Sequence, residues 1–120
     1  MSEMLRQSDD RIGMPPQTGS AAIDTHGLPW QPTDTAGFWI RPLVEDARAG
    51  HKTWLMKIDA GAFAPLHDHA ELEQIYVLDG SFYDQERSYA AGDFIVRAPG
   101  APHTAGSREG ALVLLVYLAA

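Results

Sequence analysis

The chain has 120 residues, of which 45% are hydrophobic, with a net charge of −7 and no cysteine. A chain of this size folds as one compact domain with its own core. Its acidic balance argues against nucleic-acid binding, because phosphate recognition needs clustered Lys and Arg. The lack of cysteine excludes disulfides, thiolate catalysis and cysteine-based zinc sites.

The first 20 residues mix charged residues with Gly, Pro and Ser, and we expect an irregular N-terminal arm over residues 1–20. We expect residues 21–120 to form a single barrel domain. No signal-peptide core and no spanning run of about 18 apolar residues occurs, so we expect a cytoplasmic protein that does not bind membranes. Residues 23–30 predict a first edge strand, stopped by Pro29 and Pro32. His26, within it, is expected to be a surface residue.

Two β-rich runs, residues 38–44 and 53–59, flank a polar turn and predict a hairpin. Trp54, Met56 and Ile58 alternate along the second run, so they should point into the core together. His51 lies in the turn and is expected to be solvated.

The stretch from residue 61 to residue 80 carries the candidate metal ligands. His67 and His69 point the same way on an extended chain, and Glu73 follows four residues later. Two imidazoles and a carboxylate leave coordination positions open, as in catalytic zinc and non-haem iron sites. Glu71 is the alternative carboxylate if the turn is wider. The ordinary alternative for a His-x-His pair is a solvated surface loop.

Further strands are predicted after this stretch. Residues 81–84 and 89–92 predict a hairpin, residues 92–103 a turn, a short strand, a second turn and then His103, and residues 111–120 a final buried strand. His103 is the candidate fourth ligand. Arg41 and Arg97 are expected to form ion pairs on strand faces. Short strands separated by Gly, Pro and Asp predict an all-β barrel or jelly roll.

The glycines that frame these histidines resemble the two motifs of the cupin superfamily. The first, G(X)5HXH(X)3-4E(X)6G, is matched by Gly61, His67, His69, Glu73 and Gly80. The second, G(X)5PXG(X)2H(X)3N, is matched by Gly92, Gly100 and His103, with Ala98 in place of the proline and Ser107 in place of the asparagine. The resemblance implies an antiparallel double-stranded β-helix, the jelly-roll barrel of cupins, with one divalent metal on His67, His69, Glu73 and His103.

A further resemblance covers the chain from about residue 30 onward. Trp30-Gln-Pro, Arg41-Pro-Leu, the run from Glu73 to Asp84 and Tyr89-Ala-Ala-Gly-Asp are similar to the ChrR-like cupins. That group is named for the zinc-binding cupin-like domain of bacterial anti-sigma factors. It also includes stand-alone cupins, some of them similar to aromatic-ketone dioxygenases.

Two classes of function follow. In the first, the metal is catalytic and a small oxygen-bearing substrate binds its open positions, with iron supporting dioxygenase chemistry and zinc, nickel or manganese supporting Lewis-acid chemistry. In the second, the domain is a metal- or ligand-binding sensor, as the anti-sigma resemblance implies. Twenty irregular residues are too few for a sigma-binding domain, which favours a small metalloenzyme or small-molecule binder. No catalytic residue is identified.

We also expect a homodimer. A small barrel leaves edge strands that need covering, and the N-terminal arm with Trp30, Phe38 and Trp39 offers apolar surface for a second copy.

Overall fold

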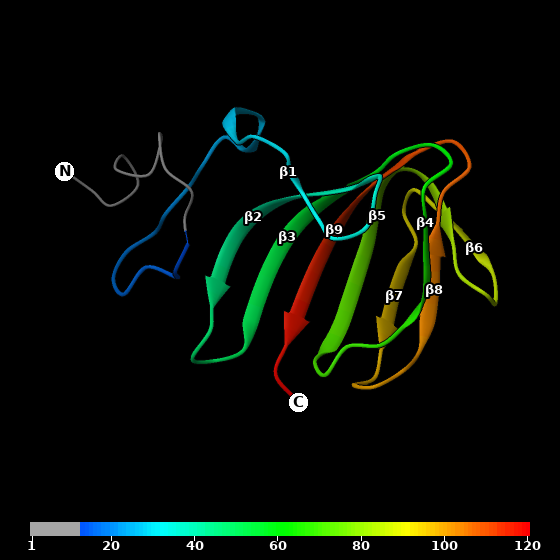
Figure 1. Cartoon of the computed structure of the whole chain (residues 1–120). Helices are drawn as coiled ribbons and strands as arrows, with labels where there is room; N and C mark the ends of the chain where they lie inside the picture. The colour runs from blue at the N-terminus through cyan, green and yellow to red at the C-terminus, as the bar shows by residue number, and fades with distance from the viewer. Residues whose placement is uncertain (1–12) are drawn as a thin grey trace.

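Two antiparallel sheets face each other in the computed structural model, which describes residues 13–120 (Figure 1). The larger sheet has the strand order β1 (Gln31–Pro32), β2 (Phe38–Asp46), β3 (His51–Ile58), β9 (Ala111–Leu118), β5 (Leu72–Tyr83) and β7 (Phe94–Arg97). The smaller sheet contains β4 (Phe63–His67), β8 (His103–Gly106), the end of β5, and β6 (Ser88–Ala90). This arrangement confirms the all-β jelly roll. Within residues 13–120, no helix has the length and apolar character needed to cross a bilayer.

The core lies between the sheets and follows the alternation of the strands. Along β9, the residues at 111, 113, 115 and 117 are buried while their neighbours are more exposed. The predicted hairpin is confirmed as β2 and β3, and Trp54, Met56 and Ile58 all line the interior. Every second residue of these strands therefore contributes to one core.

Strand β5 belongs to both sheets. It continues through Gly80 to Tyr83. A bulge between Val77 and Asp79 and the positive φ of Gly80, 72°, bend the strand as it passes from the larger sheet to the smaller one. A side chain at Gly80 would collide with the carbonyl oxygen of Gly110.

The two departures from the second cupin motif are accommodated in turns. Ser107 is fully buried; its hydroxyl donates to the carbonyl oxygen of Ser81 at 2.6 Å and accepts from the N–H of Gly110 at 2.8 Å. The N–H of Ala101 donates to the carbonyl oxygen of Ala98 at 3.1 Å, so the turn closes without a proline. Neither departure disturbs the strand that carries His103.

The expected edge strand over residues 23–30 was wrong. A short 3-10 helix, η2 (Thr25–Gly27), occupies its middle, because the Asp24 carboxylate accepts from the N–H of His26 and caps the turn. The strand itself is only Gln31–Pro32, and His26 is exposed, as expected. Of the expected arm, residues 1–12 lie outside the described part of the chain. Gly13 forms an isolated parallel bridge with Val44.

Replacing Gly80 by Ala should destabilise the fold more than replacing Gly61 by Ala. Both glycines have positive φ, 72° and 85°, which costs an alanine about 1–2 kcal/mol. Only Gly80 also meets a backbone atom, whereas an added side chain at Gly61 has nothing within 4 Å. Thermal unfolding of both variants measures the difference. Equal losses of stability would show that the close approach at Gly80 relaxes freely.

Candidate metal centre

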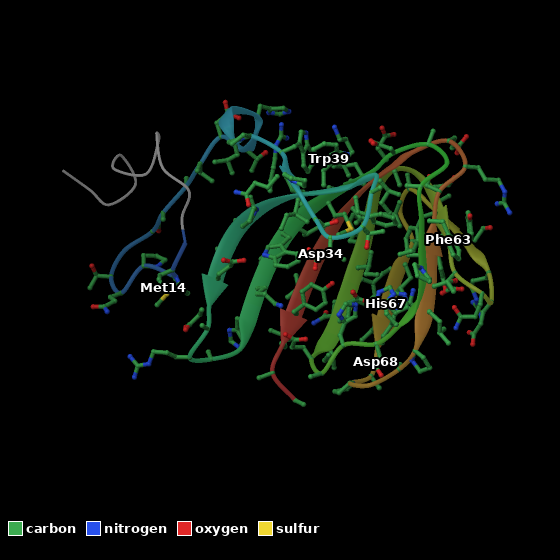
Figure 2. All side chains as sticks on the ribbon, in the orientation of Figure 1. Met14, Asp34, Trp39, Phe63, His67 and Asp68 are labelled. Carbon is green, nitrogen blue, oxygen red and sulfur yellow. The ribbon has the colours of Figure 1, made fainter. Side chains whose placement is uncertain are left out.

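Three histidines converge at one end of the barrel interior. His67 ends β4 and is the cross-strand partner of His103, which begins β8, while His69 lies in the connection from β4 to β5. One ring nitrogen from each histidine lies within 4.8 Å of the others. Figure 2 shows His67 between the sheet of β9 and β5 and the pair β4 and β8. The fold thus brings together the three histidines that the sequence singled out, whereas His26 and His51 are exposed elsewhere.

Two of these rings are oriented by backbone carbonyls. Nδ1 of His67 lies 2.7 Å from the carbonyl oxygen of Pro65, and Nδ1 of His103 lies 2.9 Å from that of Thr104. A carbonyl oxygen only accepts, so each Nδ1 carries the proton. The lone pair is then on Nε2, the nitrogen that a metal would bind.

Glu73 brings a carboxylate to the same place. It is 3% exposed, and its Oε2 and Oε1 lie 3.5 Å from Nε2 of His69 and Nε2 of His103, respectively. Glu71, the alternative carboxylate, instead pairs with Lys52 at 3.2 Å. The carboxylate beside the histidines in this structure is therefore that of Glu73.

Two cross-strand neighbours hold Glu73 in place. Tyr117 of β9 and Arg97 of β7 are its register partners on either side. The Tyr117 hydroxyl donates to Oε2 at 2.7 Å, and Nε of Arg97 lies 3.2 Å from Oε1. Burial, reinforced by the negative charge of Glu73, raises the pKa of Tyr117, so this hydroxyl stays protonated and remains a donor.

The buried atoms of this group fit a divalent metal ion. Oε1 of Glu73 and Nε2 of His103 are both buried without a hydrogen-bond partner. Burial, reinforced by the nearby Arg97 cation, lowers the pKa of His103, which favours the neutral imidazole that a metal requires. Among the described residues, Oε1 of Glu73 has only the ion pair with Arg97. Buried acceptors without a hydrogen bond are costly, and a cation held by imidazole nitrogens and a carboxylate oxygen would satisfy them.

Arg97 also links the site to a second buried carboxylate. Its Nη2 lies 3.1 Å from Oδ2 of Asp84, which accepts from the Tyr89 hydroxyl at 2.6 Å. Oδ1 of Asp84 accepts from the N–H groups of Glu86 and Arg87. The expected ion pair of Arg97 is thus confirmed. Arg41 instead donates to the carbonyl oxygen of Leu28 and stacks on Trp30.

Sequence reasoning missed Tyr117, Asp84 and Tyr89. The signal for Tyr117 was present, because the alternation of the last strand puts it on the same face as Leu115 and Val113. Asp84 follows β5 in a turn, so strand alternation gave no information about it.

A cavity of about 370 Å³ opens beside the histidines and Glu73. Its walls are mostly apolar and come from both sheets. They include Phe38, Trp54, Met56, Ile58, Ile75, Phe82, Val113 and Leu115. The loop after β1, which crosses in front of β9 and β5 in Figure 1 and carries the labelled Asp34 in Figure 2, also lines it. The three histidines and Glu73 therefore lie at the edge of a largely apolar cavity.

Comparisons with known proteins agree with the fold seen in the structure. The sequence profile of a family described as the ChrR Cupin-like domain matches residues 18–120. No protein of curated function matches the chain.

Similar folds occur among solved structures. An RmlC-like cupin protein from Ralstonia eutropha JMP134 is 21% identical with a TM-score of 0.75, and the match covers 84% of this chain and 69% of that one. The polyketide cyclase RemF from Streptomyces resistomycificus is 19% identical with a TM-score of 0.74, covering 85% and 81%. The complex of Rhodobacter sphaeroides SigE with the anti-sigma ChrR matches at 23% identity and a TM-score of 0.68, covering 78% of this chain and 51% of that one. The chain therefore spans about half of the length of that last relative, and identities this low establish the fold alone.

Replacing Asp84 by Asn should remove stability that depends on pH. Burial alone would raise the pKa of Asp84, but the hydrogen bonds from Tyr89, from the Glu86 and Arg87 N–H groups and from Arg97 outweigh it and lower the pKa to about 2. A carboxyl with a depressed pKa stabilises the fold above its unfolded pKa of about 3.9, and this contribution is lost as the pH falls through 2.

The wild-type protein should therefore exceed Asp84→Asn in unfolding free energy at pH 7, by roughly 2 kcal/mol on the linkage relation. The gap should narrow between about pH 4 and pH 2. Chemical denaturation across this range measures it, and a gap that does not change with pH would contradict the assignment.

Proposed function

The chain belongs to the ChrR cupin-like domain family, and from that membership we propose that it is a metal-binding cupin, most simply a small metalloenzyme. The observation that supports this is the pair of buried ligand atoms that accept no hydrogen bond, Oε1 of Glu73 and Nε2 of His103, beside the imidazoles of His67 and His69. We assign one divalent metal to His67, His69, Glu73 and His103.

The chemistry of the ligand atoms limits which metal ions suit the site. Imidazole nitrogens with one carboxylate suit iron and zinc first, with nickel and manganese as alternatives. When bound, such an ion supplies Lewis acidity or, as iron(II), an open position for dioxygen.

The protein's own residues set the conditions for that chemistry. Tyr117 and Arg97 hold the two oxygens of Glu73 from opposite strands. The carbonyls of Pro65 and Thr104 fix the rings of His67 and His103. The mostly apolar cavity walls lower the local polarity, which strengthens electrostatic interactions at the site.

The cavity supports an enzyme over a purely structural metal site. A structural site is closed by protein ligands, whereas here about 370 Å³ of space adjoins the ligand group. A small substrate with oxygen atoms at one end and an apolar or aromatic body fits this chamber, and dioxygenase-type chemistry is our first choice.

The alternative function is a sensor module that binds a metal or ligand without turnover. The observation that favours it is the structural similarity to the complex that contains the anti-sigma ChrR. The same cavity would then hold a signalling ligand. The two functions differ in turnover, since only the enzyme consumes a substrate.

The proposal includes a homodimer and a cytoplasmic location. Of the residues first expected at the dimer surface, Phe38 is buried in its own chain. Trp39 donates to Asp59, and Trp30 is covered by Arg41.

Metal content should distinguish the ligand histidines from the others. His67→Ala and His103→Ala should each lose most of the bound metal, whereas His51→Ala, a matched change at an exposed histidine, should keep it. Glu73→Gln keeps the shape without the charge and should weaken binding less than a histidine deletion. Metal analysis of the purified variants measures this. Full occupancy in His103→Ala together with loss in Glu71→Ala would overturn the ligand set.

Metal affinity should fall as the medium becomes more acidic. Protons compete for the imidazole nitrogens, so affinity should drop steeply below the ordinary histidine pKa of about 6.5. Because burial lowers the pKa of His103, this ligand should stay available to lower pH than an exposed imidazole. Titration with Zn²⁺ between pH 5 and pH 8 measures the slope, and a flat profile would exclude histidine ligation.

Turnover separates the enzyme from the sensor. Protein purified without added metal should be analysed for its metal, loaded with iron(II), and tested for oxygen uptake on diketones and hydroxyaryl ketones. Uptake that His103→Ala abolishes and His51→Ala retains supports the enzyme. Saturable ligand binding with no product formed would instead support the sensor.

A further inference from the structure

One guanidinium group is shared by two buried carboxylates. Arg97 ends β7, and its side chain is only 12% exposed. Its Nε lies 3.2 Å from Oε1 of Glu73, and its Nη2 lies 3.1 Å from Oδ2 of Asp84. The side chains of Glu73 and Asp84 are 4% and 1% exposed. A single positive charge therefore faces two negative charges in a part of the molecule that water barely reaches.

Asp84 is held in place by its own turn. The N–H groups of Glu86 and Arg87 donate to its Oδ1 at 2.8 and 3.0 Å. The Tyr89 hydroxyl donates to its Oδ2 at 2.6 Å. Burial opposes ionisation of this carboxyl, but the hydrogen bonds outweigh it and lower its pKa to about 2, so Asp84 is charged at neutral pH. Asp84 is thus a fixed negative charge beside Arg97.

Arg97 and a metal ion would compete for the same carboxylate oxygen. Oε1 of Glu73, which Arg97 contacts, also lies 3.5 Å from Nε2 of His103. If Glu73 were the one anionic partner of Arg97, the two would form a neutral buried pair. A cation placed beside that pair would meet the guanidinium with no net negative charge to offset the repulsion. The second carboxylate, that of Asp84, supplies the missing negative charge.

We propose that Asp84 is a positioning residue of the metal centre: by pairing with Arg97, it leaves Glu73 the negative charge that a divalent cation needs. In the part of the chain that the structure describes, the hydrogen bonds and the ion pair of Asp84 involve none of the four assigned ligands. Its effect on the metal would therefore pass through Arg97. The inference rests on the proposed function, because it concerns how strongly the assigned ligand set binds its metal.

A purely structural role for Asp84 leads to a different result. The Asp84–Arg97 pair joins the turn after β5 to β7, so its loss lowers the stability of the protein with or without metal. A structural role alone would lower the unfolding temperatures of the metal-free and the zinc-loaded protein equally and leave the dissociation constant for zinc unchanged. A positioning role raises that constant, so zinc then stabilises the variant less than it stabilises the wild type.

The first test neutralises Asp84 alone. Asp84→Asn should weaken Zn²⁺ binding by roughly tenfold or more, as is usual for residues that orient a metal ligand. Competition with a chromophoric chelator at pH 7 measures the dissociation constant, and thermal unfolding with and without zinc gives the second readout.

Two variants serve as controls for this test. Tyr89→Phe removes one donor to the same carboxylate but keeps its charge, so its zinc affinity should stay close to that of the wild type. Asp59→Asn makes the same substitution at an exposed carboxylate, which accepts from Trp39, and should bind zinc like the wild type.

The second test removes the competing guanidinium. In Arg97→Gln no cation competes with the metal for Glu73, so adding Asp84→Asn should change zinc affinity much less than it does in the wild type. The double variant should bind zinc more tightly than Asp84→Asn alone. Such a cycle isolates the coupling between two side chains. If Arg97→Gln does not fold, Asp84→Asn and its two controls decide the proposal by themselves.

Two outcomes would overturn the proposal and leave the metal centre standing. Zinc affinity of Asp84→Asn equal to that of the wild type would make Asp84 a structural residue only. An equal loss of affinity from Asp84→Asn with and without Arg97→Gln would show that Asp84 does not act through Arg97. A wild-type protein that binds no zinc would instead refute the ligand assignment itself, and this inference with it.

Discussion

The burial of the Glu73 carboxylate is the constraint on which the rest of the site depends. A charge that is almost fully removed from water must be compensated, and this one has Tyr117 and Arg97 as neighbours on its two flanking strands. Arg97 is itself shared with Asp84, so its one positive charge faces two carboxylates. The imbalance leaves this corner of the barrel short of positive charge. A divalent cation between Glu73 and the histidines would supply it.

The jelly roll explains how residues far apart in sequence reach this one point. Strand β5 starts in the larger sheet with Glu73 and ends in the smaller sheet, while β4 and β8 of the smaller sheet carry His67 and His103. The bend at Gly80 therefore closes the barrel around the site. The same alternation that turns Glu73 inward turns Tyr76 outward, so β5 lines the candidate site with one face and meets solvent with the other.

Much of this could be predicted because it depends on local spacing. The histidine pair, the glycine turns and the alternation of Trp54, Met56 and Ile58 are all short-range patterns. The predictions that were wrong or missing concern a local hydrogen bond that competes with strand formation, or contacts between residues far apart in the sequence. The run before Trp30 has strand composition, yet the His26 N–H donates to the Asp24 carboxylate and a 3-10 turn forms there instead. The contacts of Glu73 with Tyr117 and of Arg97 with Asp84 required the strand order, which spacing does not contain.

We propose that the three histidines and Glu73 hold one divalent metal. Anomalous diffraction from crystals of the metal-loaded protein, recorded on both sides of the metal's absorption edge, tests it directly. We expect a single anomalous peak within bonding distance of Nε2 of His67 and His103, a ring nitrogen of His69 and an oxygen of Glu73, at about 2.0–2.2 Å for zinc. A peak elsewhere, or no peak between these side chains after loading, would contradict it.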